Sequence, residues 1–367
     1  MNPIIISCVL FLAFFGVVMI YSASYYSADL SYDDGFYYAR KQLIGVILGI
    51  IALIICFNID FNRLQKYGFI ALIISIIILA LVFIPWLGVT NYGATRWIGI
   101  FGLTIQPSEL AKFAFVLFCA GYLAKNRDYV HKFKTLVPIL LAGLMLCGLI
   151  ILEPNLSITI CVGLTMVFML FIGGIRKKHL GYLSVPLLSA LPILIISEPY
   201  RIKRLLAFLD PFSSAQNEGF QLVQSLYSLS AGGLFGVGLF NSRQKYLFLP
   251  FSESDFIYSI IGEELGLFGC LFIIIIFGIL IIEGIRIAMR AQNRFGAYLA
   301  SGIVFVIAIQ VIINMAVVTG CIPPTGLPLP FISYGGTAIL VFMSAIGILL
   351  NIDKQSREYK QKKWCIK

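Results

Sequence analysis

The feature that most limits the fold of this chain is a series of apolar runs, each close to the length that crosses a bilayer. A membrane-spanning helix needs about 20 predominantly apolar residues. An open sheet cannot hide its backbone in lipid, and these runs are too continuous for the alternating pattern of a membrane barrel. The sequence therefore predicts an all-α polytopic membrane protein. The ten runs that we assign to helices cover residues 3–22, 42–58, 67–86, 108–124, 136–152, 156–174, 181–197, 256–282, 298–320 and 337–352.

Composition agrees with a membrane protein and excludes a set of soluble domains. Hydrophobic residues make up 60% of the chain and charged residues only 12%, against roughly 45–50% and about 25% in soluble domains. We find no soluble domain, clear repeat or low-complexity tract, so we expect a single membrane domain over residues 1–367. Its basic tail, residues 353–367, is expected to lie on the inner membrane surface. The first run has no Lys or Arg before it, which favours an uncleaved first span over a signal peptide.

The basic residues divide unevenly between the two sides of the predicted spans. Eighteen of the 27 Lys and Arg residues lie in the segments 59–66, 125–135, 175–180, 283–297 and 353–367. Lys and Arg are enriched in the cytoplasmic loops of membrane proteins, so we place both termini in the cytoplasm. The longer connections then lie outside, with the largest between the seventh and eighth spans. Any chemistry is therefore expected at the outer face.

The eight cysteines do not indicate a disulfide framework or a zinc site. Six of them lie inside apolar runs, where cysteine behaves as a small hydrophobic residue. The chain has no C-x-x-C pair and only two His residues, so zinc ligands are lacking.

The first outer segment with unusual polar residues runs from about 93 to 112. Pro107 suits the first turn of a helix, and Glu109 favours its positive end, whereas Lys112 is unfavourable there. Arg96 and Lys112 are candidates to hold an anion. The alternatives for Lys112 are an i,i+3 pair with Glu109 or a lysine that snorkels to the membrane surface. Trp97 on its own is typical of the aromatic belt at a membrane interface.

The long outer loop, residues 198–255, opens with Arg201, Lys203 and Arg204. These three charges can contact a phosphate-bearing lipid, or they can belong to an amphipathic segment on anionic headgroups. Residues 216–239 are rich in Gly and mildly amphipathic, which favours helices that lie at the interface.

Asp255 ends this loop and opens the eighth predicted span. Ser and Asp are ordinary residues at a helix start, so a capping role and a catalytic role both remain open. Glu263 follows on the same side of the helix and is a candidate to line a cavity below Asp255, whereas Glu264 points away and is expected to pair within the bundle. Glu153 and Asn314 are further candidates for buried polar groups.

The last outer loop holds four prolines and three glycines between residues 323 and 336. Irregular backbone at membrane depth is tolerated only where protein or water satisfies its polar groups. This loop is therefore expected to form the wall of a cavity.

Five short motifs occur in order along the chain. They are Arg96-Trp97-Ile98, residues 106–112, Leu249-Pro250 followed by Asp255-Phe256-Ile257, residues 262–266, and residues 329–336. Together they resemble the SEDS family of peptidoglycan polymerases, which contains the FtsW, RodA and SpoVE proteins. The resemblance covers essentially the whole chain. Residues 198–204 are more similar to the division and sporulation branch than to the elongation branch.

The resemblance implies a glycosyltransferase that polymerises lipid II, a disaccharide-pentapeptide on undecaprenyl diphosphate, at the outer face of the bacterial cytoplasmic membrane. Asp255 would then be the general base on the acceptor 4-hydroxyl. The resemblance also leaves room for a divalent cation, Mg or Mn, at the diphosphate, and implies a class B penicillin-binding transpeptidase as the partner. The side chains that would contact the substrate, with Arg and Lys at the diphosphate, are Arg96, Lys112, Arg204, Lys245, Glu109, Trp97, Glu263 and Ser333.

Two other functions fit the same sequence less well. A flippase or transporter for the same lipid is compatible with ten helices and intramembrane carboxylates, but its polar sites should face both sides of the membrane. A scaffold without activity would not need Asp255, Arg96 and Lys112. The chain also departs from the usual family pattern Gln-Pro-Asp, because Glu153, Pro154 and Asn155 stand there.

Overall fold

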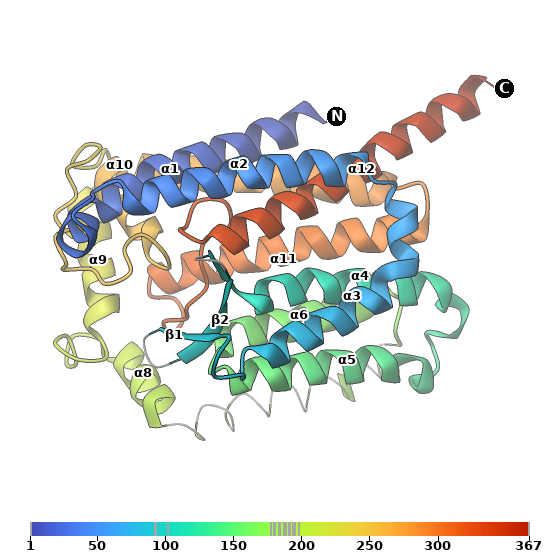
Figure 1. Cartoon of the computed structure of the whole chain (residues 1–367), viewed down its shortest axis with the longest axis horizontal. Coiled ribbons are helices and arrows are strands. Elements are labelled where there is room, and N and C mark those ends of the chain that lie inside the picture. The colour runs from blue at the N-terminus through green and yellow to red at the C-terminus, as the bar shows by residue number, and fades with distance from the viewer. Residues whose placement is uncertain are drawn as a thin grey trace.

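The computed structural model is a bundle of long helices whose two termini lie at the same end (Figure 1). It describes residues 2–91, 94–100, 103–176 and 199–365, with isolated positions between 177 and 198. We refer to the end with the termini as the terminal end, and to the opposite end, where α8 and α9 lie, as the site end. The common position of the termini agrees with an even number of crossings, and the charge distribution assigns the terminal end to the cytoplasm.

Eight of the predicted spans are confirmed as helices long and apolar enough to cross a membrane. Another predicted span, 156–174, is the slightly shorter apolar helix α6. The predicted span 181–197 lies in the stretch 177–198, outside the continuously described residues. The helices of the described part are α1 (Pro3–Tyr32), α2 (Tyr37–Asn58), α3 (Phe61–Leu81), α4 (Pro107–Lys125), a short 3₁₀ turn η1 (Arg127–Tyr129), α5 (Phe133–Leu152), α6 (Leu156–Ile172), α8 (Pro199–Leu209), α9 (Phe220–Gly232), α10 (Ile257–Arg290), α11 (Arg294–Val318) and α12 (Gly336–Cys365).

Several helix starts follow from local capping. The side chain of Asp60 accepts a hydrogen bond from the N–H of Asn62 at the start of α3, and Asn155 accepts one from Ile158 at the start of α6. Such caps satisfy N–H groups that the helix itself leaves unpaired. The cap at Asp60 explains why α3 begins six residues before the predicted span at 67.

A small sheet, which the sequence analysis did not predict, lies between α3 and α4. Its antiparallel strands are β1 (Gly88–Asn91), β2 (Ala94–Ile100) and β3 (Leu103–Ile105), in that order. Trp97 on β2 is paired with Val89 on β1, and Ile98 with both neighbouring strands. The sheet therefore fixes the position of Arg96, which precedes Trp97 on the central strand.

The long outer loop contains two helices, α8 and α9, as its composition predicted. The second of these packs against α10 instead of lying free at the surface, because Leu222, Val223, Ser225 and Ser228 on α9 are buried. Ser225 and Ser228 bind Ser259 of α10, through its hydroxyl and its carbonyl oxygen. These bonds place the loop over the outer half of α10.

Helix α10 is broken at Gly266, where φ is 66° and ψ is −165°. The backbone groups freed by the break are taken up by the glycine-rich segment 233–238 that follows α9. This segment acts as a local partner for the broken helix, so no freed group is left facing lipid. The four hydrogen bonds run from Val237 N to Glu263 O (2.9 Å), from Gly238 N to Glu264 O (3.0 Å), from Leu267 N to Gly233 O (2.9 Å) and from Phe268 N to Leu234 O (3.2 Å).

We predict that Gly236→Ala destabilises the protein by about 2–4 kcal/mol. Gly236 has a φ of 80°, and a Cβ at this position would lie 2.1 Å from the carbonyl oxygen of Glu264. The left-handed conformation costs a non-glycine residue about 1–2 kcal/mol, and the steric overlap adds to that cost. Thermal unfolding of the purified variant in detergent measures the effect.

The matched control is Gly278→Ala on the same helix, α10. Among the described residues, no heavy atom lies within 4 Å of a Cβ at Gly278. We expect this variant to stay within about 1 kcal/mol of wild type. Equal melting temperatures for the two variants would contradict the proposed role of the segment 233–238.

Candidate functional site

Asp255 lies at the site end, directly before α10, and its surroundings come from three distant parts of the chain. Its backbone carbonyl accepts a hydrogen bond of 2.8 Å from Asn314 Nδ2 on α11. Its carboxyl lies against the last outer loop, since a Cβ at Gly326 would be 3.3 Å from Asp255 Oδ2. The side chain is half-buried. The structure therefore holds this carboxyl at the junction of α10, α11 and the last outer loop.

The electrostatic surroundings of Asp255 suit a proton acceptor. Burial raises the pKa of Asp255 to about 7, the charges of Arg96 and Arg204 act in the opposite direction, and that of Glu253 adds to the rise. A general base works best when its pKa lies near the working pH. Three residues that the sequence analysis selected, Asp255, Arg96 and Arg204, thus interact within one site.

Arg96 is fixed at the edge of this site by the turn between α5 and α6. Its Nε donates to the carbonyl oxygen of Glu153 at 3.2 Å, and its Nη2 donates to that of Pro154 at 2.5 Å. The same turn is tied to the last outer loop, because Gly326 N donates to Ser157 Oγ at 3.1 Å. The guanidinium is therefore held by backbone carbonyls and keeps its full positive charge.

The last outer loop has its irregular backbone satisfied by side chains of three helices, as expected for a cavity wall. Asn314 donates to Leu327 O, and Gln310 donates to Pro328 O, both from α11. Gln42 of α2 donates to the carbonyl of Ser333 and accepts from Gly335 N.

Ser333 is itself one of these ties. Its hydroxyl donates to Ser254 O at 2.6 Å and accepts from Leu329 N at 2.7 Å. The residue thereby joins the last outer loop to the segment just before Asp255. Its contact with a substrate stays a prediction.

Lys112 and Glu109 form a buried pair near this loop. Lys112 Nζ lies 2.9 Å from Glu109 Oε1 and 2.6 Å from Gln310 Oε1. The lysine is 1% exposed and the glutamate is fully buried. The i,i+3 pairing is confirmed, whereas the predicted contact of Lys112 and Glu109 with a diphosphate stays a prediction. Through Gln310, the pair positions the last outer loop at Pro328.

Glu263, Glu264 and Lys245 form a second buried cluster at the break in α10. The carboxylate of Glu263 accepts from Ser242 Oγ and from Arg243 N, so it holds the turn at residues 242–244. Glu264 pairs within the bundle, as predicted: Ser22 of α1 donates to it, and Lys245 Nζ lies 4.0 Å away. Glu263 is 1% exposed, so a cavity-lining role is not what this geometry supports, and the substrate contacts predicted for Glu263 and Lys245 are untested.

We predict that Glu264→Gln lowers stability by about 1–3 kcal/mol and leaves activity in the folded fraction. The amide keeps the shape of the side chain but removes the negative charge that faces the buried Lys245. Thermal unfolding in detergent, followed by an activity assay of the folded protein, measures both quantities. Glu358→Gln, at an exposed carboxylate on α12, is the control and is expected to have little effect. A large loss of rate at unchanged stability would place Glu264 in the chemistry instead.

The described residues contain no group of three or more His, Cys, Asp or Glu side chains that could hold a metal ion. The protein side chains of this part therefore do not fit a preformed site for Mg or Mn. No step of the mechanism below is assigned to a metal.

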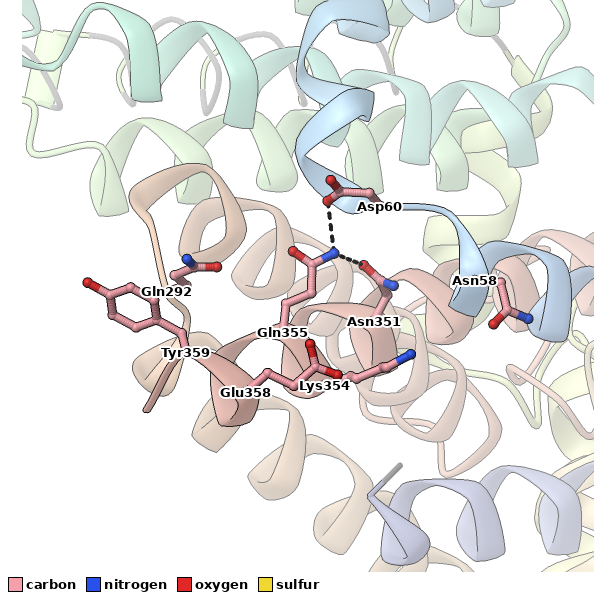
Figure 2. Close-up of a pocket in the computed structure, with 8 residues that line it drawn as sticks. All are labelled: Asn58, Asp60, Gln292, Asn351, Lys354, Gln355, Glu358 and Tyr359. Carbon is pink, nitrogen blue, oxygen red and sulfur yellow. Dashed lines mark hydrogen bonds between the residues drawn. The ribbon is translucent and has the colours of Figure 1, made fainter. Parts of the chain in front are cut away.

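A polar hollow of about 350 Å³ lies at the terminal end, far from Asp255. Figure 2 shows its lining residues, in which Gln355 bridges Asp60 and Asn351 by hydrogen bonds of 2.8 and 3.1 Å. The bond from Gln355 holds the pKa of Asp60 below its usual value. Because these polar groups satisfy one another, we interpret the hollow as the joint between α3 and α12 and place the candidate site around Asp255. The lining residues are Asn58, Asp60, Gln292, Asn351, Lys354, Gln355, Glu358 and Tyr359.

Sequence reasoning did not select Gln42, Gln310 and Ser157, although all three fix the last outer loop. A signal was present for two of them. Gln42 and Gln310 stand inside or beside apolar runs, where a polar side chain is costly unless it has a partner. Ser157 carried no such signal, because serine is common near a helix start.

Comparison with known proteins gives a consistent assignment. The family model of the cell cycle proteins FtsW, RodA and SpoVE matches residues 2–358. Stage V sporulation protein E of Bacillus subtilis is 41% identical over 346 residues, which cover 93% of this chain and 94% of that protein. A probable peptidoglycan glycosyltransferase FtsW of Geobacter metallireducens is 41% identical over 344 residues, covering 94% and 92%.

The fold also matches a solved structure. A chain from work on the structural coordination of polymerization and crosslinking by a peptidoglycan synthase complex superposes with a TM-score of 0.80. The match covers 96% of this chain and 97% of that chain, at 24% identity. This similarity supports the all-α architecture predicted from the apolar runs.

Proposed function

This chain belongs to the FtsW, RodA and SpoVE family, and on that premise we propose that it is a peptidoglycan glycosyltransferase that polymerises lipid II. It is a multi-pass protein of the bacterial cytoplasmic membrane. The observation that carries the proposal is the carboxyl of Asp255, which has a pKa of about 7 and lies within the electrostatic reach of Arg96 and Arg204. The name of the Geobacter relative supports the same activity.

The proposed reaction uses Asp255 as the general base. The carboxylate takes the proton of the acceptor 4-hydroxyl while that oxygen attacks the anomeric carbon of the donor sugar. The bond from the anomeric carbon to the lipid diphosphate breaks, and its electron pair leaves with the diphosphate. One displacement inverts an α-linked donor into a β-linked product, so no covalent sugar intermediate is needed.

Arg96 and Arg204 are proposed to stabilise the charge that grows on the leaving diphosphate. Fixed cations in a site with little water are effective because they need not reorganise during the reaction. Arg96 fits this role because its guanidinium is held by the carbonyls of Glu153 and Pro154. We propose that Lys112, Glu109, Lys245, Glu263 and Ser333 shape the walls of the site from their buried positions, and that Trp97 lies at the membrane interface.

We also propose a class B penicillin-binding transpeptidase as the partner, which would crosslink the new glycan. The support is indirect: the solved chain with the same fold belongs to a complex described by both polymerization and crosslinking.

A flippase is the second function considered for this fold. A broken membrane helix such as α10 often marks a transport site. Here, however, the groups freed at Gly266 are bound by the segment 233–238 and are not open to a cavity. This observation favours the polymerase.

The proposal is tested by incubating the purified protein with labelled lipid II, with and without the cognate transpeptidase. We expect glycan strands to form at the expense of lipid II, and the diphosphate lipid to be released in equal numbers with the new bonds. Absence of glycan in both mixtures, together with movement of labelled lipid II across vesicle membranes, would replace the polymerase with the flippase.

A further inference from the structure

Glu153 ends α5 at the site end and is an unusual carboxyl. Its side chain is fully buried, with 0% exposure. Neither of its carboxyl oxygens has a hydrogen-bond donor among the described residues. An ionised carboxylate in such a place is costly unless a partner compensates it, whereas the neutral acid is tolerated more easily.

The surroundings of Glu153 connect it to the proposed site. Arg96 binds the backbone of the same turn through the carbonyls of Glu153 and Pro154, at 3.2 and 2.5 Å. The charge of Arg96 acts on the carboxyl of Glu153 and on that of Asp255. Two carboxyls from distant parts of the chain thus share the influence of one guanidinium, although they do not bond to each other.

We propose that Glu153 is a positioning residue that remains a neutral carboxylic acid in the working enzyme, so that the charge of Arg96 stays available to the lipid diphosphate. A neutral Glu153 leaves Asp255 and the substrate as the anions that Arg96 serves. An ionised Glu153 would be a third anion next to that guanidinium and would compete with the substrate for it. The inference rests on the proposed function for the identity of the substrate.

The charged groups on the elements packed around Glu153 support this assignment. Arg96 comes from β2, and Lys112 and Glu109 on the neighbouring α4 are paired with each other, so they add no net charge. Asn155 at the start of α6 is uncharged and caps that helix. Arg96 is therefore the unbalanced charge that Glu153 meets among these described residues.

The direction of the pH effect follows from burial. Burial raises the pKa of Glu153 to about 8, and the charge of Arg96 limits the rise. Below this pH the carboxyl is neutral and Arg96 is available. Above it the carboxyl ionises and attracts the guanidinium. Binding of the diphosphate is therefore expected to weaken as pH increases through about 8.

The experiment measures binding of undecaprenyl diphosphate to the purified full-length protein at pH 7 and at pH 9. For wild type we expect binding to weaken by about 5- to 10-fold between the two values, since one pKa unit corresponds to a tenfold change. Glu153→Gln keeps the shape but cannot ionise, so its binding should change by less than about 2-fold. Any pH dependence of the ligand itself is common to both proteins and cancels in the comparison.

Two further measurements keep the inference falsifiable. Glu153→Leu also lacks the ionisable group and replaces Glu153→Gln if that variant fails to fold. Infrared difference spectra between wild type and Glu153→Gln at pH 7 should contain the carbonyl stretch of a protonated carboxyl. A purely structural role would leave the pH dependence of binding the same in all three proteins and would overturn the inference, as would the absence of the carbonyl band.

The outcome is separable from that of the proposed function. A protein that forms no glycan from lipid II, yet loses diphosphate binding at high pH only when Glu153 is present, would refute the polymerase and retain the role of Glu153. A protein that forms glycan and whose pH dependence persists in Glu153→Gln would do the reverse.

Discussion

Asp255→Asn is expected to reduce the rate of lipid II polymerisation by about 10²- to 10⁴-fold, the range over which a positioned general base contributes to catalysis. The amide has the same shape and can keep the contact with Gly326, but it cannot accept the proton of the acceptor hydroxyl. The hydrogen bond from Asn314 goes to the backbone carbonyl and is unaffected by the change. The variant should therefore fold, and its melting temperature in detergent checks this.

The pH profile of the wild-type enzyme tests the same assignment without a mutation. Only the ionised carboxylate acts as a base, and the pKa of Asp255 is raised to about 7. The rate should therefore increase with pH through about 7 and be low in more acidic solution. The increase reports the group that takes the proton.

Asp29→Asn is the matched control for this change. Asp29 is an exposed aspartate on the outer part of α1, so the same chemical substitution there should leave the rate unaltered. Equal amounts of glycan from wild type and Asp255→Asn would remove Asp255 from the role of base and leave the polymerase activity in place.

Lys112→Ala is expected to cost about 3–5 kcal/mol of stability, the second large effect. The substitution would leave the carboxylate of Glu109 buried without its cation, and loss of one member of a buried ion pair is strongly destabilising. It would also release Gln310, whose amide nitrogen donates to Pro328 O in the last outer loop. Thermal unfolding in detergent measures the loss. Lys125→Ala, at an exposed lysine on the same helix, should change stability by less than about 1 kcal/mol.

The double variant Lys112→Met, Glu109→Gln separates folding from substrate contact. It replaces the buried ion pair with neutral groups of similar size, and such replacements are often neutral or stabilising. We expect its stability to return toward that of wild type. Restored stability with restored lipid II binding would leave Lys112 a structural residue, whereas restored stability with lost binding would assign it the predicted diphosphate contact. A double variant as unstable as Lys112→Ala would contradict the ion-pair explanation.

The last outer loop connects these effects. It lies against the carboxyl of Asp255 at Gly326, binds the Lys112 cluster through Pro328, and is tied to the segment before α10 by Ser333. A change in any of these buried clusters therefore alters the position of the loop relative to Asp255. Residues that are too buried to touch a substrate can still affect the reaction in this way.

Local properties of the sequence determined the membrane architecture. Whether a run of 20 residues crosses a bilayer depends on its own length and apolarity, and eight predicted spans are accordingly helices of the required kind. Helix starts at Asp60 and Asn155 also depend on bonds within a few residues. The i,i+3 pair of Glu109 and Lys112 was predictable for the same reason. The five motifs were sufficient for the family, because each is a short contiguous pattern.

Tertiary structure alone decided which polar residues meet. Arg96 acts on Asp255 although 159 positions separate them in the chain, and Lys112 is paired with Glu109 and Gln310 inside the bundle, where the sequence had suggested a diphosphate contact. The break in α10 and its bonds to the segment 233–238 were equally invisible beforehand, as was the small sheet that carries Arg96. The physical reason is that a buried charge or a freed backbone group needs a partner within about 3 Å, and only the packing of distant segments provides one.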